Sequence, residues 1–253
     1  MFISRKFIPS LFTILNAFCG MMSVINSAKG DFDEAALFII YASLFDAVDG
    51  LAARLTNSAS RFGVELDSLS DVISFGLAPS ILIYYVYLNQ LGDIGIVMSS
   101  LIMVFAAIRL ARFNVQLTGF EKSKFSGLPA PMSAFTICSY ILFYHNKIFS
   151  DNVSEIFIMS LSVFLPVMMV SKVKYDTIPK PSLRAIKKNP IVFIIIFIAV
   201  ILTIVTKGEG SFSFCLFYIF SGMIRSGYNK FFHKHKKSSG EDLNDSLEFN
   251  KSK

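Results

Sequence analysis

Long apolar runs, separated by short polar segments, dominate the chain. We count eight runs that approach or exceed the roughly 18 to 20 residues needed to cross a bilayer as a helix, at residues 8–28, 33–54, 62–89, 93–114, 130–146, 151–171, 190–206 and 211–228. The fifth and the last two are short or carry polar residues. The first is too long, and too soon followed by another, for a cleaved signal peptide. The pattern predicts an all-α integral membrane protein.

The loops between these runs divide the chain into four parts. The first six runs are joined by short loops and predict one packed six-helix core over residues 1–171. Residues 172–189 form a longer, basic, proline-containing loop, and residues 190–228 hold a terminal pair of helices rich in Ile and Phe. Residues 229–253 are charged and rich in Ser and Asn, a composition typical of disordered tails.

Composition and charge add an orientation to this picture. Hydrophobic residues make up 53% of the 253 positions. With the N-terminus inside, all of the 24 Lys and Arg residues fall on inner segments except Lys29, Lys147 and Lys207. This distribution predicts an N-in, C-in protein of the inner (cytoplasmic) membrane. The net charge of +6 then lies at the lipid surface and indicates no nucleic-acid partner.

The three cysteines lie inside apolar runs without paired spacing. We interpret Cys19, Cys138 and Cys215 as small packing residues, without a disulfide or metal role.

Four aspartates interrupt the second and third apolar runs. Asp46 and Asp49 are three residues apart, and Asp67 and Asp71 are four apart, so each pair shares a helix face. Counted from the turn at Thr56–Ser60 with a rise of 1.5 Å per residue, the two pairs reach comparable depths, roughly 10 to 15 Å from the inner end. The sequence predicts that all four carboxylates meet in one pocket.

Four carboxylates in one pocket repel one another unless protons or cations intervene. Oxygen donors without His or Cys favour Mg²⁺ or Mn²⁺ over zinc. Two divalent ions would balance the four charges and could clamp a phosphoryl or pyrophosphoryl group. Gly50, Ala53 and Gly63 leave space on the same faces, and Arg54 adds a cation suited to phosphate. A proton or cation pathway in a transporter is the alternative, since intramembrane acids are common there too.

The segment from Asp46 to Asp71 resembles the signature of the CDP-alcohol phosphatidyltransferase family, D-x2-D-G-x2-A-R-x8-G-x3-D-x3-D. Every fixed position is filled, by Asp46, Asp49, Gly50, Ala53, Arg54, Gly63, Asp67 and Asp71. The resemblance implies a six-helix membrane core, usually a homodimer, with an active site open to the cytoplasmic leaflet. It also implies metal binding by all four aspartates, with Asp71 as general base. Contacts to CDP-diacylglycerol are implied for Gly50, Arg54, Ser60 and Gly63, although a hydroxyl at Ser60 is also ordinary in a turn.

Three further stretches resemble one subfamily, the bacterial type II phosphatidylserine synthases. They are IPSLFTILNAFCG from Ile8, RLARFNV from Arg109 and GLPAPMSA from Gly127. The resemblance implies transfer of the phosphatidyl group from CDP-diacylglycerol to L-serine, with release of CMP. Glycerol 3-phosphate or inositol phosphate is the alternative acceptor within the family.

Four residues in these stretches are candidates for binding serine or phosphate: Thr13, Asn16, Arg109 and Arg112. Each has a simpler alternative. The two polar residues could bond between helices, and the two arginines could anchor the protein at the lipid headgroups.

Overall fold

The computed structural model describes residues 7–55, 60–117, 127–173, 175, 201–203 and 205–228, all of them in helices, turns or coil. The elements in order are α1 (Phe7–Lys29), α2 (Phe32–Leu55), α3 (Arg61–Asp71), the π-helix η1 (Val72–Leu77), α4 (Ala78–Val86), the 3₁₀-helix η2 (Leu88–Leu91), α5 (Asp93–Leu117), α6 (Ala130–Phe143) and α7 (Asp151–Val170). Residues 210–228 form a further helix, called the terminal helix below. The predicted all-α class is confirmed.

The first six predicted runs coincide with these helices. Among the residues that the structure describes, five helical stretches are long and apolar enough to cross a membrane: Ser10–Lys29, Phe32–Ala52, Arg61–Val86, Asp93–Val115 and Asp151–Val170. The third of them joins α3, η1 and α4 into one rod. The predicted run 190–206 lies mostly outside the described residues, so the count of eight spans stays a prediction.

Helix α6 is shorter than the predicted run 130–146, with 14 residues. At its end the amides of Tyr144 and His145 both donate to the carbonyl of Tyr140, at 2.9 and 3.0 Å, and the second of these bonds spans five residues instead of four. Asn146 then adopts a left-handed φ of 51°, which ends helical geometry. Apolar residues continue past this point in the turn, where Tyr144 and Phe149 pack on each other with ring centroids 5.4 Å apart.

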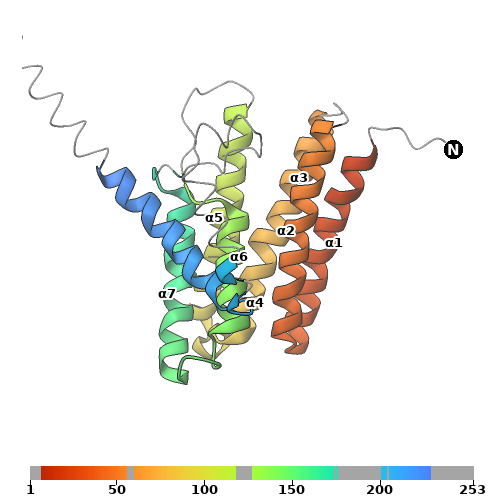
Figure 1. Cartoon of the computed structure of the whole chain (residues 1–253). Helices are drawn as coiled ribbons and strands as arrows, with labels where there is room; N and C mark the ends of the chain where they lie inside the picture. Colours follow the sequence, from red (N-terminus) through yellow and green to blue (C-terminus); the bar gives the residue numbers. More distant parts are fainter. Residues whose placement is uncertain are drawn as a thin grey trace, which may run out of the picture.

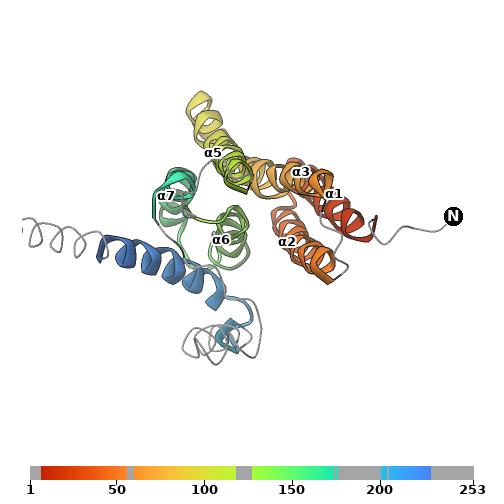
Figure 2. The ribbon, with the colours of Figure 1, turned by 90° about the horizontal axis from the view of Figure 1, so that it is seen from above.

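The helices form two groups around a shared core. Seen from above in Figure 2, α1, α2 and α3 lie on one side and α5, α6 and α7 on the other. The rod of α3, η1 and α4 connects the groups, since η1 packs against both α1 and α5. The terminal helix runs obliquely to the bundle beside α6 and α7 (Figure 1). The largest fully buried side chains include Tyr140, Phe75, Ile39 and Leu82.

The π-helix η1 packs closely against α1. The Ser74 hydroxyl donates to the carbonyl of Asn16 at 2.8 Å, so α1 and η1 nearly touch. Gly20 of α1 makes this approach possible, because a Cβ there would lie 2.6 Å from Ser74 Oγ and 2.9 Å from Ser74 Cα. A π-turn is rare and often marks a functional site; this one begins directly after Asp71.

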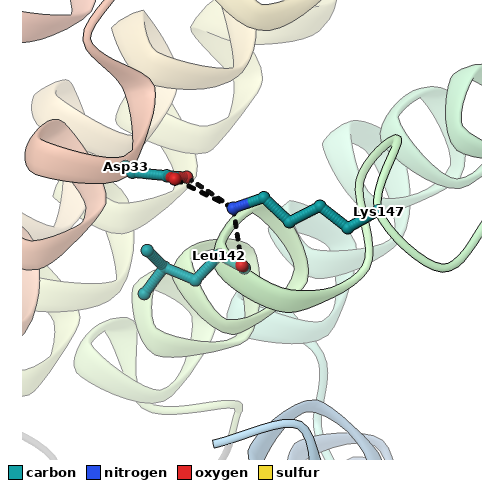
Figure 3. Close-up of polar contacts among 3 residues, drawn as sticks. All are labelled: Asp33, Leu142 and Lys147. Atoms are coloured by element: carbon teal, nitrogen blue, oxygen red, sulfur yellow. Dashed lines mark hydrogen bonds and ion pairs between the residues drawn. The ribbon is translucent and has the colours of Figure 1, made fainter.

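An ion pair joins the two groups at the end of the bundle where α2 begins. Lys147 Nζ donates to both carboxylate oxygens of Asp33 at 2.9 Å and to the carbonyl of Leu142 at 2.8 Å (Figure 3). The contact ties the α6–α7 turn to the first turn of α2. It leaves the opposite end, where α2 ends and α3 begins, to be organised by other residues.

We predict that Gly20→Ala destabilises the fold by about 1–3 kcal/mol, the usual range for overpacking. The added methyl group would push α1 away from Ser74. Thermal unfolding followed by circular dichroism in detergent measures the effect. Gly227→Ala is the matched control, because a Cβ at Gly227 meets nothing within 4 Å. Equal melting temperatures for the two variants would contradict the proposed close packing.

Candidate active site

The hairpin of α2 and α3 brings three carboxylates together. One ligand oxygen from each of Asp46, Asp49 and Asp67 lies within 4.8 Å of the others. Asp49 is buried, and the other two are half-buried. The predicted convergence of the two helix faces is confirmed for these three residues, which we call the acidic triad.

Asp71 lies one helical turn beyond Asp67 on α3 and is 8% exposed. It is not a member of the acidic triad, but its carboxylate interacts electrostatically with all three members. Asn16 Nδ2 donates to Asp71 Oδ1 at 3.3 Å. Asp71 therefore belongs to the same acidic site and is held by α1.

Helix α1 supplies polar support to both sides of the hairpin. Thr13 Oγ1 donates to Asp49 Oδ2 at 2.9 Å, one turn before Asn16 reaches Asp71. Both side chains are buried, Asn16 completely. They contact aspartates of two different helices, so α1 fixes the position of the α2 acid relative to the α3 acid. The predicted alternative of bonding between helices is thus realised, and a direct contact with substrate stays a prediction.

The residues of the acidic triad fit a divalent cation. Two ionised carboxylates at this separation repel by roughly 3–4 kcal/mol in the effective dielectric of a protein surface. One hydrogen bond to a charged group contributes about 1.5–3 kcal/mol, so the Thr13 bond alone does not offset three such pairs. Asp67 Oδ1 is buried without a hydrogen-bond partner among the described residues. A hard cation would satisfy that oxygen and the charge together.

Ser60 and Gly63 start α3. Ser60 is its N-cap, and its hydroxyl accepts from the amide of Gly63 at 3.0 Å. A Cβ on Gly63 would lie 3.2 Å from that hydroxyl, so glycine leaves the cap undisturbed. This geometry matches the turn interpretation of Ser60. Gly50 follows Asp49 on α2, and the side chain of Arg54 lies outside the described parts, so their contacts with CDP-diacylglycerol stay predictions.

The two arginines of α5 have different surroundings. Arg109 is half-buried and interacts electrostatically with Asp71 and with Tyr218 of the terminal helix. Arg112 is exposed, and its Nη1 donates to the carbonyl of Val170 at 3.2 Å. A cation at the last carbonyls of a helix is stabilising, which matches a structural role for Arg112. Arg109 is thus the α5 arginine whose charge favours an ionised Asp71.

Two contacts near the site were not predicted from the sequence. Asn114 Nδ2 donates to Ser68 Oγ at 2.9 Å and links α5 to α3 beside Asp67. Both residues lie in stretches that carry the family resemblance, but nothing in their spacing pairs them. The second is the electrostatic interaction of Tyr218 with Arg109. Tyr218 lies in an apolar run, and no motif or spacing in the sequence marks it.

Known proteins resemble the chain over most of its length. The family model described as CDP-alcohol phosphatidyltransferase matches residues 6–169. A CDP-diacylglycerol–serine O-phosphatidyltransferase of Helicobacter pylori is 36% identical over 217 residues, 86% of this chain and 90% of its own. An archaetidylserine synthase of Methanothermobacter thermautotrophicus is 41% identical over 173 residues, 68% of this chain and 70% of its own.

The Bacillus subtilis protein with the same name as the Helicobacter one is 34% identical over 178 residues, 69% of this chain and 93% of its own. The matched region holds the whole α2–α3 hairpin with its acidic triad and Asp71. The chain therefore belongs to the CDP-alcohol phosphatidyltransferase family.

Proposed function

We propose that the protein transfers the phosphatidyl group of CDP-diacylglycerol to L-serine, forming phosphatidylserine and releasing CMP. The acidic triad beside Asp71 and Arg109 carries the proposal, because it joins carboxylates to a cation at one place. The names of the relatives support serine as acceptor. They differ in the lipid, phosphatidyl or archaetidyl, but each contains serine.

Members of this family use divalent metal ions, and we assign Asp46, Asp49, Asp67 and Asp71 as the residues that hold two Mg²⁺ or Mn²⁺ ions. When bound, such ions neutralise the pyrophosphate of the nucleotide lipid and polarise it for displacement. Thr13 and Asn16 orient two of these carboxylates through the hydrogen bonds described above. Outer partners of this kind position metal ligands and raise their affinity.

Two residues of the chain then bind and deprotonate the acceptor. Asp71 takes the proton from the serine hydroxyl, whose oxygen forms a bond to the phosphatidyl phosphorus. The bond between that phosphorus and CMP breaks, and CMP leaves with the electron pair. Arg109 matches the carboxylate of serine or the lipid-linked phosphate, since a guanidinium grips either with two parallel hydrogen bonds.

The distribution of basic residues supports a site that faces the cytoplasm in the inner membrane. CDP-diacylglycerol, a membrane lipid, then reaches the acidic site from the inner leaflet and serine from the cytoplasm. The family resemblance supports a homodimer. These assignments are part of the proposal.

We expect CMP release from CDP-diacylglycerol with L-serine, and none with glycerol 3-phosphate or inositol phosphate. A phosphate-bearing acceptor requires a denser basic cluster than Arg109 provides.

Arg109→Lys should raise the serine KM roughly tenfold, because the ammonium keeps the charge but loses the two parallel hydrogen bonds of the guanidinium. Arg112→Lys should have a smaller effect. CMP release with glycerol 3-phosphate would support the family assignment but contradict serine as the acceptor. Cation uptake into liposomes without CMP release would instead favour a transporter.

We expect excess EDTA to abolish activity and Mg²⁺ or Mn²⁺ to restore it. Thr13→Val should raise the Mn²⁺ concentration for half-maximal activity roughly 10- to 100-fold, the usual effect of an outer partner. Thr136→Val is the matched control, because its hydroxyl donates to the carbonyl of Met132 within α6. Full activity in excess EDTA would contradict the assignment of the four aspartates as metal ligands.

Asp71→Asn should lower kcat by more than ~100-fold, the usual contribution of a general base. The amide keeps the shape and a partner for Asn16 but cannot take the proton. Single-turnover measurements of CMP formation, with circular dichroism to check folding, separate this loss from misfolding. A near-normal rate would show that another group accepts the proton.

A further inference from the structure

Asn16 of α1 is completely buried where α1 meets α3 and η1. Its backbone carbonyl accepts from the Ser74 hydroxyl at 2.8 Å, and its Nδ2 donates to Asp71 Oδ1 at 3.3 Å. An ionised carboxylate only accepts hydrogen bonds, so the side-chain amide turns its nitrogen toward Asp71. The atom that remains for another group is the amide oxygen, Oδ1.

This amide oxygen is buried and has no hydrogen-bond partner within the parts of the chain that the structure describes. A buried acceptor without a donor is destabilising, and native proteins contain few of them. Asp67 Oδ1 is in the same condition, but a metal ion held by the acidic triad would satisfy it. Asn16 is not a member of the acidic triad. Its oxygen therefore indicates a ligand that brings a hydrogen-bond donor.

The proposed acceptor, L-serine, carries such a donor to this place. The proposed function assigns the serine hydroxyl to Asp71 but gives the serine ammonium group no partner. That ammonium is on the carbon next to the one that bears the hydroxyl, so it lies near Asp71 whenever the hydroxyl does. Oδ1 of Asn16 shares its carbon with the nitrogen that contacts Asp71. An ammonium has N–H donors and a positive charge that the aspartates attract.

We propose that Oδ1 of Asn16 accepts a hydrogen bond from the ammonium of the acceptor, and thereby selects acceptors with an amino group beside the reacting hydroxyl. Ser74 and Asp71 hold the amide in the orientation that this contact needs. The inference rests on the proposed function, which places the acceptor hydroxyl at Asp71. A site built to hydrogen-bond one group of its substrate discriminates strongly against an analogue without that group.

The analogue 3-hydroxypropionate tests the proposal, because it keeps the hydroxyl and the carboxylate of serine and lacks only the amino group. We compare kcat/KM for CMP release with both acceptors in the wild-type protein and in Asn16→Ala. Loss of the bond to Asp71 should lower kcat/KM for both acceptors by the same factor. Loss of the bond to the ammonium should lower kcat/KM for serine by a further factor of roughly 10 to 100, the scale of one hydrogen bond to a charged group.

Thr13→Val is the matched control. The Thr13 hydroxyl donates to Asp49 Oδ2 from the same face of α1, so this variant also loses a bond that holds an aspartate. It should lower kcat/KM for both acceptors by the same factor. Asn16→Asp keeps the size of the side chain and an oxygen in the place of Oδ1. It should retain the preference for serine, although the bond to Asp71 is lost.

Protection against thermal unfolding tests the contact without turnover. L-Alanine has the ammonium and the carboxylate of serine but no hydroxyl, and propionate lacks the ammonium as well. With CDP-diacylglycerol present, L-alanine should raise the melting temperature of the wild-type protein more than propionate does, because a ligand that binds the folded state more tightly stabilises it more. The difference should disappear in Asn16→Ala.

Equal factors for serine and 3-hydroxypropionate in Asn16→Ala would overturn the proposal, because they would show that Asn16 acts only through Asp71. A lost preference for serine in Asn16→Asp, or equal protection of the wild-type protein by L-alanine and propionate, would also overturn it. If the wild-type protein releases CMP with glycerol 3-phosphate or inositol phosphate but not with serine, the proposed function itself fails. The inference then fails with it, since those acceptors have no ammonium.

Discussion

Repulsion among carboxylates is the constraint on which the site depends. Asp46, Asp49 and Asp67 bring their oxygens within 4.8 Å of one another, in a chain whose other intramembrane positions are largely apolar. The two ionised pairs that Asp67 makes with Asp46 and Asp49 oppose the approach of α2 and α3, so the hairpin needs positive charge between or beside these helices. A divalent ion, as proposed above, would provide it at the centre, and Arg109 adds to it at Asp71. On the proposed function, substrate binding and the stability of the hairpin would depend on the same charges.

Helix α1 acts as the template for this arrangement. It contacts α2 along much of its length and packs against α3 and η1. Its polar residues, Thr13 and Asn16, face one acid on each partner helix. Because the carbonyl of Asn16 also accepts from Ser74, the same residue fixes both the acid and the backbone that follows it. A shift of α1 by one turn would separate all of these contacts together.

The sequence predicted those features of the structure that depend on the spacing of residues within one helix. Apolar run length predicted the first six helices, and intervals of three and four predicted the convergence of the triad. It did not predict the features that depend on contacts between segments far apart in the chain. The early end of α6 depends on the turn at Tyr144 and Asn146. The different surroundings of Arg109 and Arg112 depend on where α7 ends and where Tyr218 lies. A three-residue spacing defines a shared face but not the neighbour that each side chain meets.

The π-helix after Asp71 has a consequence for how the chain can tolerate length changes. A π-turn holds one more residue than an α-turn, and each residue in an α-helix accounts for about 100° of rotation. Deleting one residue between Val72 and Leu77 could restore a regular α-helix. Because the wide turn absorbs its extra residue, α4 would keep its facing relative to Asp67 and Asp71, but Ser74 would lose the position from which it donates to the carbonyl of Asn16. An inserted residue would instead rotate α4 by about a quarter turn relative to the acids. Insertions and deletions should therefore be tolerated in the turns between spans and excluded from this six-residue stretch.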